Sequence, residues 1–340
     1  MILIFSKSFD YTTFQVIKWL NHLGEFDIVR INSDEKNNIT FSVRENDFTI
    51  QIDEHIIESD KIRAVWYRKG ANWLGGQFNE ISLREHPKLT LYLNDKMRKE
   101  NQKLSEYLHY LIEKKYPVLG SAFKSNLNKL VTLNIAKSVG LRTPEFFVVN
   151  EKKSIECLIK NGNSYITKAM SDGVYLFESD EKRKGYFSYT ELLARENIAR
   201  YTEKMPPSFI QSKIEKHYEV RVFFLDGQFF AWAIFSQADD QTRTDYRKYN
   251  YKKPNRVVPY LLPEKIINKL SNLFKKIGLN TGSADLMVDL EDNHYFLEIN
   301  PVGQFNMLSK LANNQLELKV AKWLINNANR QSRLNAANSN

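Results

Sequence analysis

Apolar and polar residues alternate strictly in several short stretches of this chain, and between them apolar residues recur at helical spacing. The segments ITFSV and FTIQI alternate around an Asn-Asp turn and predict a β-hairpin. The apolar run Ile2 to Phe5 predicts a buried strand, followed by a helix that Thr12 or Thr13 caps and Gly24 ends. This order is typical of α/β proteins.

The same pattern continues to about residue 120. Ala64 to Tyr67 reads as a buried strand that leads into Arg68 and Lys69, and a long helical region follows from Leu83 to Lys115. We therefore expect residues 1–120 to form one α/β domain. Strand ends carry ligands in such sheets, so the Arg-Lys pair predicts either a receptor for carboxylates or phosphate, or a solvated basic turn.

Two lysines stand out in the next part of the chain. Lys129 lies in the first turn of a helix that Asn126 or Asn128 caps, where its charge opposes the helix dipole. Lys168 lies within the apolar run Tyr165 to Met170, which predicts a strand. Each lysine indicates either an anionic ligand or an ordinary surface position.

Two further hairpins carry charged side chains. In the first, Tyr218 to Phe224 and Gln228 to Phe235 alternate around an Asp-Gly turn and place Glu219 and Arg221 on one face. An arginine in such an apolar strand needs an anionic partner. From Pro263, an amphipathic helix leads into the second hairpin.

That second hairpin lies within Thr281 to Phe305 and can bring Asp285, Glu298 and Asn300 together. Three oxygen ligands without sulfur or imidazole suit a hard cation such as Mg²⁺. The alternative is a surface hairpin with a solvated acidic rim. The position of Glu298 favours the metal site, because this residue interrupts an apolar run in which an unpaired carboxylate would be unfavourable to bury.

Composition narrows the class of protein. The chain has 340 residues, 42% of them hydrophobic, one cysteine (Cys157) and a formal net charge of +9. A lone cysteine excludes an internal disulfide and favours a reducing compartment, and no run has the length of a membrane span, so we expect a cytoplasmic protein with no membrane partner. The positive charge fits an enzyme of nucleotides or acidic substrates. The polar end, residues 326–340, is expected to be disordered.

The order of these motifs resembles the ATP-grasp superfamily over residues 120–325. Within it, WYRKG, NKLVTLNIAKSVGLRTP, IQSKIEKHYEVRVF, TDYR and FLEINPVGQF resemble the graspetide maturases, above all those of grasp-with-spasm systems. The resemblance implies an α/β (α+β) fold with an N-terminal pre-ATP-grasp domain (1–120), a central subdomain (121–210), a C-terminal subdomain holding ATP and Mg²⁺ (211–325) and a polar tail (326–340).

The resemblance also implies roles for single residues. Those expected to bind ATP are Lys129 and Lys168 at the phosphates, Gln211, Lys213 and Ile214 at adenine, and Glu215 or Glu219 at the ribose. Those expected at the reacting phosphate are Asp285, Glu298 and Asn300 as Mg²⁺ ligands and Arg221 and Arg247 as stabilising cations. Only Gly173 and Gly185 are available for a phosphate-covering loop, which departs from the family pattern.

The implied reaction is activation of an Asp or Glu side chain of a ribosomal precursor peptide by ATP, followed by attack of a Ser, Thr or Lys side chain. The products would be a macrocyclic ester or amide, ADP and phosphate. The family further implies a radical SAM/SPASM protein in the same pathway and a homodimer.

Three other functions compete with this one. A ligase that adds free glutamate would use the same ATP site. A protein kinase would also need a strand lysine, but its HRD and DFG segments are missing from the sequence. A nucleic-acid-binding module would fit the charge, yet the basic residues are scattered and no recognition motif is present, so we expect no nucleic-acid partner.

Overall fold

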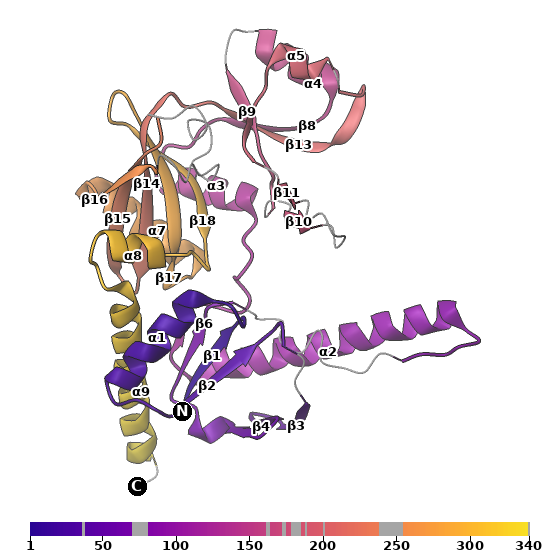
Figure 1. Ribbon diagram of the computed structural model, residues 1–340, viewed down its shortest axis with the longest axis vertical. Coiled ribbons are helices and arrows are strands. Elements are labelled where there is room, and N and C mark those ends of the chain that lie inside the picture. The colour runs from indigo at the N-terminus through magenta and orange to yellow at the C-terminus, as the bar shows by residue number, and fades with distance from the viewer. Residues whose placement is uncertain are drawn as a thin grey trace. The chain divides into compact units, whose positions relative to one another are not determined.

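A computed structural model describes residues 1–35, 38–69, 81–160, 164–171, 175–177, 185–187, 189–199, 201–237 and 254–338. The chain divides into two compact units (Figure 1). Unit 1 comprises Met1–Asn126, Leu279–Thr281 and Gln304–Asn340, and unit 2 comprises Leu127–Gly278 and Gly282–Gly303. The finer division at residues 120, 210 and 325 stays a prediction.

Unit 1 is built on a parallel sheet of four strands. Its order is β2 (Ile28–Asn32), β1 (Ile2–Ser6), β6 (Ala64–Tyr67) and β7 (Val118–Leu119). The predicted hairpin forms part of a separate antiparallel sheet of β3 (Ile39–Arg44), β4 (Asp47–Ile52) and β5 (His55–Glu58), which a short 3-10 turn (Ser59–Lys61) follows.

Helices cover both faces of the parallel sheet. Alternate strand residues such as Leu3 and Val65 share one core with Leu108 and Ile112 of α2 (Pro87–Lys115). On the other face lie α1 (Tyr11–His22) and α9 (Leu316–Asn338), which pack against each other, and α9 also packs against β6 (Figure 1). The short α8 (Asn306–Leu311) precedes α9.

Two expectations about unit 1 are wrong in detail. Asp10, not a threonine, caps α1, because its carboxylate accepts the amide of Thr13 at 2.8 Å. Residues 326–338 are not disordered, because they belong to α9, which continues to Asn338 and in which Leu324 and Ala328 are fully buried. The few apolar residues of this polar segment recur at helical spacing. Their packing against α1 and β6 stabilises the helix, which the polar composition alone does not predict.

Unit 2 contains two larger sheets. The first has the order β12 (Glu191–Leu192), β9 (Tyr165–Thr167), β13 (Lys204–Ser212) and β8 (Phe146–Glu151), with α4 (Lys152–Lys160) and α5 (Arg195–Ile198) beside it. A small hairpin is formed by β10 (Tyr175–Phe177) and β11 (Gly185–Phe187). The second sheet has the order β16 (Arg256–Tyr260), β15 (Gln228–Phe235), β14 (Lys216–Leu225), β17 (Thr281–Asp289) and β18 (His294–Asn300).

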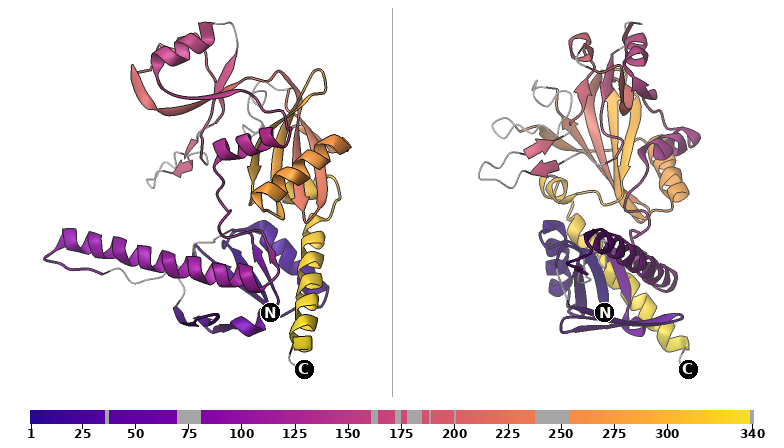
Figure 2. Two further views of the ribbon diagram at one scale, coloured as in Figure 1. Left: turned by 180° about the vertical axis from the view of Figure 1, so that it is seen from behind. Right: turned by 90° about the vertical axis from the view of Figure 1, so that its right-hand side faces the viewer.

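The five-stranded sheet of unit 2 has an apolar face and a charged face. Phe224 and Phe229 contact Phe274 of α7 (Glu264–Ile277), and α7 lies beside α3 (Lys129–Ser138), as Figure 2 shows. Because side chains alternate along β14, Glu219 and Arg221 belong to the opposite face. Both predicted hairpins, β14–β15 and β17–β18, are confirmed.

Candidate functional site

The acidic pair of the candidate site lies on the β17–β18 hairpin. Asp285 and Glu298 are direct cross-strand partners, and Ser283 faces Asn300 two residues away. The register shifts immediately after Asp285. Facing residues of an antiparallel pair point to the same side of the sheet, so the two carboxylates come together as the sequence predicts.

A cation contacts each of these carboxylates. Arg221 Nη1 lies 3.5 Å from Asp285 Oδ1, and Lys129 Nζ lies 3.0 Å from Glu298 Oε2. Lys129 also donates a hydrogen bond to the carbonyl of Ala169 at 2.9 Å. This bond connects the start of α3 with the segment after β9, where Lys168 lies with its Nζ 5.9 Å from the centre of the Phe209 ring. The ion pair also supplies the anionic partner that a lysine in a first helical turn requires.

The candidate ribose ligand Glu219 belongs to a buried cluster. Its Oε1 accepts hydrogen bonds from the ammonium of Lys216 and, at 3.0 Å, from the hydroxyl of Ser236. Burial raises the pKa of the Glu219 carboxyl, although Lys216 opposes this shift, and the nearby Asp285 raises it further. Lys216 is not among the predicted site residues, although its position at the start of the same apolar strand, three residues before Glu219, is visible in the sequence.

The connection between β13 and β14 carries the predicted adenine hinge. The amide of Lys213 donates to the carbonyl of Ser164 at 2.9 Å, and its Nζ lies 2.5 Å from Glu215 Oε1. Glu215 is mostly exposed, whereas Ile214 is half-buried. The two ribose candidates therefore differ: Glu215 lies in solvent, and Glu219 is buried on the charged face of the sheet.

Several buried polar atoms near these residues have no hydrogen-bond partner. They include both polar atoms of the Gln211 amide, Nε1 of Trp232 and the hydroxyl of Ser283. Trp232 is the cross-strand partner of Arg221, and Ser283 lies two residues before Asp285. An unsatisfied buried group lowers stability by about 1–3 kcal/mol, so the positions of Trp232 and Ser283 next to Arg221 and Asp285 in the sheet favour a site that receives a polar ligand.

The donors around Asp285 and Glu298 fit a magnesium ion. Within the described part of the chain no three His, Cys, Asp or Glu side chains gather closely enough to hold a metal without other ligands. Two carboxylates with an amide oxygen are nevertheless typical of Mg²⁺, which keeps water and substrate phosphates in its other positions. Asn300 is exposed and its Oδ1 accepts the amide of Val302 at 3.0 Å.

Two sequence predictions lie outside the described residues. Arg247 belongs to the segment 238–253, and Gly173 of the predicted phosphate loop lies between two described stretches. Their roles stay predictions. None of the helices in the described ranges combines the length and the apolar character needed to cross a membrane.

Comparisons with solved structures identify proteins of similar fold. The RiPP-associated ATP-grasp ligase of Chryseobacterium gregarium, solved with ADP and a leader and core peptide, is 23% identical over 96% of both chains, with a TM-score of 0.77. The macrocyclase MdnC of Microcystis aeruginosa MRC, solved with its precursor peptide MdnA, is 23% identical over 96% of this chain and 99% of its own (TM-score 0.73).

The ATP-grasp ligase PsnB, solved with Mg, ADP and a variant of its minimal precursor, is 16% identical over 96% of this chain and 98% of its own (TM-score 0.70). No protein-family model matches the sequence, and the search of curated proteins found no match. The likeness is thus one of structure, and the chain has the ATP-grasp fold that the sequence analysis expected.

Proposed function

We propose that this chain is an ATP-dependent, ADP-forming peptide maturase that closes ester or amide rings in a ribosomal precursor peptide. The observation that carries the proposal is the pairing of Asp285 with Glu298, with Arg221 and Lys129 in contact with them. The fold adds support, because ATP-grasp ligases of the same fold were solved with ADP, Mg and precursor peptides.

ATP would bind between the two sheets of unit 2. Lys129 and Lys168 would hold the phosphates, and the unsatisfied amide of Gln211 would meet the adenine edge together with the backbone of Lys213 and Ile214. Since the amide of Lys213 already donates to the carbonyl of Ser164, the carbonyl of Lys213 would be the group that contacts the adenine edge. Of the two ribose candidates, Glu219 lies on the charged face of the sheet and is the better placed, with Glu215 as the alternative.

Asp285, Glu298 and Asn300 would hold Mg²⁺. When bound, the ion supplies positive charge to the terminal phosphates during phosphoryl transfer. For it to bind, Asp285 and Glu298 would exchange their contacts with Arg221 and Lys129 for the metal, and the two released cations would turn to phosphate oxygens. Arg221, and Arg247 by resemblance, would then stabilise the charge that develops on the transferred group.

The reaction has two steps whose atoms balance. A carboxylate oxygen of the peptide attacks the γ-phosphorus of ATP, so that an acyl phosphate forms and ADP leaves. A Ser or Thr hydroxyl, or a Lys amine, then attacks the acyl carbon, loses its proton and expels inorganic phosphate. Each ring closed removes one water from the peptide and consumes one ATP.

Partners and setting belong to the same proposal. We place the enzyme in the cytoplasm, acting on its precursor as a homodimer, with a radical SAM/SPASM protein in the same grasp-with-spasm pathway. The exposed, unpaired Cys157 is compatible with a reducing compartment. Light scattering of the purified chain tests the dimer, and the dimer is excluded if the mass found is that of one chain.

The test of the enzyme class is ADP release in the presence of Mg²⁺ and any small peptide rich in Asp or Glu that is encoded beside this gene. We expect peptide-dependent ADP formation that Glu298→Gln abolishes, because the substitution removes a charge without changing the shape of the side chain. Glu291→Gln, in the exposed turn of the same hairpin, is the matched control and should keep full activity. ADP formation by E298Q at the normal rate would contradict the proposal.

A further inference from the structure

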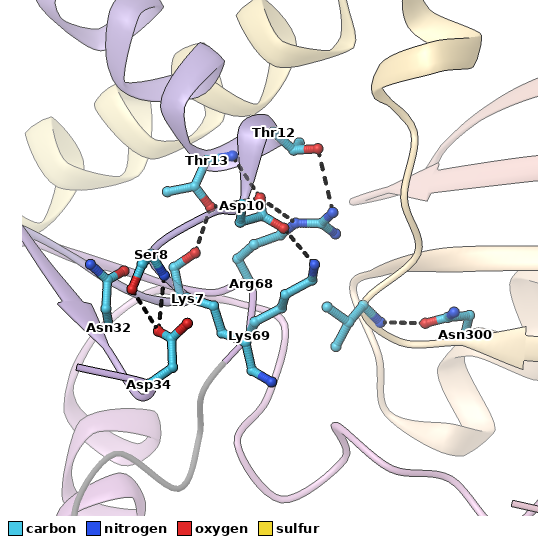
Figure 3. A network of polar contacts seen from close by, with 12 residues as sticks. Lys7, Ser8, Asp10, Thr12, Thr13, Asn32, Asp34, Arg68, Lys69 and Asn300 are labelled. Atoms are coloured by element: carbon cyan, nitrogen blue, oxygen red, sulfur yellow. Dashed lines mark hydrogen bonds and ion pairs between the residues drawn. The ribbon is translucent and has the colours of Figure 1, made fainter. Parts of the chain in front are cut away.

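Unit 1 has a second cluster of charges, which includes the Arg68-Lys69 pair of the WYRKG motif. Asp10 follows β1, and Arg68 and Lys69 follow β6, so all three lie at the carboxyl end of the parallel sheet. Figure 3 shows the Asp10 carboxylate between these two cations and the first turn of α1. Lys69 Nζ lies 2.7 Å from Asp10 Oδ2, and Arg68 Nε lies 3.4 Å from Asp10 Oδ1.

The position of this cluster in the sheet is the one where α/β sheets bind ligands. The chain leaves β1 through α1 toward β2 on one side, and leaves β6 through α2 toward β7 on the other. The connections therefore diverge between β1 and β6, which makes this the topological switch point of the sheet. The residues directly after the two diverging strands are those of the cluster.

The three residues of the cluster carry two positive charges and one negative charge. Both cations contact the Asp10 carboxylate, and the side chain of Lys69 is 27% exposed, so its ammonium can contact both Asp10 and solvent. Burial alone would raise the pKa of Asp10, but Arg68, Lys69 and the amide of Thr13 hold it at about 2. Arg68 is only 3% exposed, and its guanidinium lies 5.6 Å from the centre of the Phe305 ring. Arg68 thus adds its positive charge from below the surface, and Lys69 is the cation that an incoming anion can contact.

Aromatic side chains on both sides of Asp10 in the sequence reach solvent. Phe9 is 97% exposed and Tyr11 51%, and Phe14 follows one turn later at 47%. Lys310 of α8 adds a positive charge here, because its Nζ lies 3.2 Å from the Tyr11 hydroxyl and over the Tyr11 ring. We call the set Phe9, Tyr11, Phe14, Lys69 and Lys310 the aromatic-basic surface.

We propose that the aromatic-basic surface binds an acidic segment of a peptide, with a Glu or Asp carboxylate at Lys69 and an apolar side chain against Phe9 and Tyr11. Positive charge beside exposed aromatic rings is complementary to alternating acidic and apolar residues. Free phosphate would satisfy the cations but would leave the aromatic rings in water. The site deepens the proposed function by naming where unit 1 holds the substrate, and it rests on that function only for the peptide's identity.

The experiment measures binding without nucleotide. The full-length protein is titrated into a short fluorescein-labelled peptide of alternating Glu and Leu, and into its Gln-Leu counterpart, and anisotropy is recorded. We expect the Glu peptide to bind at least about tenfold more tightly, the size of one charge-assisted hydrogen bond. Lys69→Gln should abolish that difference, whereas Lys61→Gln, at an exposed lysine of the same unit, should preserve it.

A second variant keeps the test independent of folding. Phe9→Ser removes a ring that is almost wholly exposed, and it should raise the dissociation constants of both peptides by a similar factor. Phe26→Ser, at another exposed ring, is the control. If Lys69→Gln weakened the binding of both peptides equally, Lys69 would have a structural role and the proposal would be overturned. Unchanged binding in Lys69→Gln and Phe9→Ser would overturn it as well.

Competitors and nucleotide binding separate the remaining outcomes. Displacement by millimolar inorganic phosphate with no preference for the Glu peptide would identify a phosphate site, and displacement by an oligo-dT strand with no such preference would identify a nucleic-acid surface. Either result contradicts an acidic-peptide site. Calorimetry with ADP and Mg²⁺ tests the proposed enzyme separately, because a wild-type protein that binds ADP normally but shows no preference for the Glu peptide overturns only this inference.

Discussion

Lys129 and Glu298 form an ion pair, with 3.0 Å between Nζ and Oε2, although one begins a helix and the other lies in the edge strand of a sheet. The lysine also bonds to the carbonyl of Ala169, so it joins three segments around the candidate phosphate site. The pair gives a lysine at a helix start an anionic partner, and under the proposed function Lys129 would bind ATP and Glu298 would bind Mg²⁺.

Lys129→Met should therefore weaken nucleotide binding more than it weakens the fold. We expect the ADP dissociation constant, measured by calorimetry with Mg²⁺, to rise at least about tenfold, since a charge-assisted contact to phosphate is lost. Asn128 still caps α3 in this variant. Lys275→Met, on the exposed side of α7, is the control. An unchanged dissociation constant in Lys129→Met would remove this residue from the phosphate site.

Gln211→Leu should affect the thermal stability of the free protein and its binding of ADP in different ways. The buried amide of Gln211 has no hydrogen-bond partner, so an apolar residue of similar size should leave the melting temperature of the free protein unchanged or raise it. ADP should then raise that temperature less than in the wild type, because the adenine edge loses its partner. Gln228→Leu, at an exposed strand position, is the comparison. An equal ADP-induced shift in both variants would place adenine elsewhere.

Gly303 should tolerate no side chain. A Cβ at this position would lie 2.0 Å from Ser283 Oγ and 2.9 Å from its backbone nitrogen. Gly303→Ala should lower the free energy of unfolding by about 1–3 kcal/mol through overpacking and should disturb the end of the acidic hairpin. Ser283→Ala removes an unsatisfied hydroxyl and should leave the free energy of unfolding unchanged or raise it. Denaturant unfolding of the two variants checks both expectations, and a fully stable Gly303→Ala protein would contradict this packing.

Asp10 should make the stability of unit 1 depend on acid pH. Its pKa is lowered from 3.8 to about 2 in the folded protein. The folded state therefore holds the charged form more tightly, and the resulting stabilisation of about 2 kcal/mol is present above pH 4 and lost as the pH falls toward 2. Asp10→Asn should be less stable than the wild type at pH 7, and the gap should close near pH 2. Asp60→Asn, an exposed position, should show no such convergence. A gap that is constant with pH would contradict the ion-pair account.

The sequence predicted the strands and hairpins better than it predicted contacts between side chains that are far apart in the chain. Strict alternation around turn residues located the β14–β15 and β17–β18 hairpins, because a period of two leaves few alternatives when one face is buried. The same alternation placed Asp285 near Glu298. It could not show that Lys216 and Ser236 share the Glu219 carboxylate, because that contact depends on how strands and loops meet in space.

Two further features depended on tertiary packing. The polar end of the chain forms α9 only because α1 and β6 receive its narrow apolar stripe. The pairing of Asp10 with Arg68 and Lys69 requires β1 and β6 to be neighbours, although β2 to β5 intervene in sequence. Strand order is a global property, which residue spacing along the chain does not contain.

We propose above all that this protein, which has the ATP-grasp fold, forms intramolecular ester or amide bonds in a peptide. The most direct measurement is the intact mass of any small Asp- or Glu-rich peptide encoded beside the gene, after incubation with the protein, Mg²⁺ and ATP. The account predicts the loss of one or more waters, dependent on ATP and absent with Glu298→Gln. A stepwise gain in mass when amino acids are added would instead identify an amino-acid ligase, and an unchanged mass without ADP formation would contradict the account altogether.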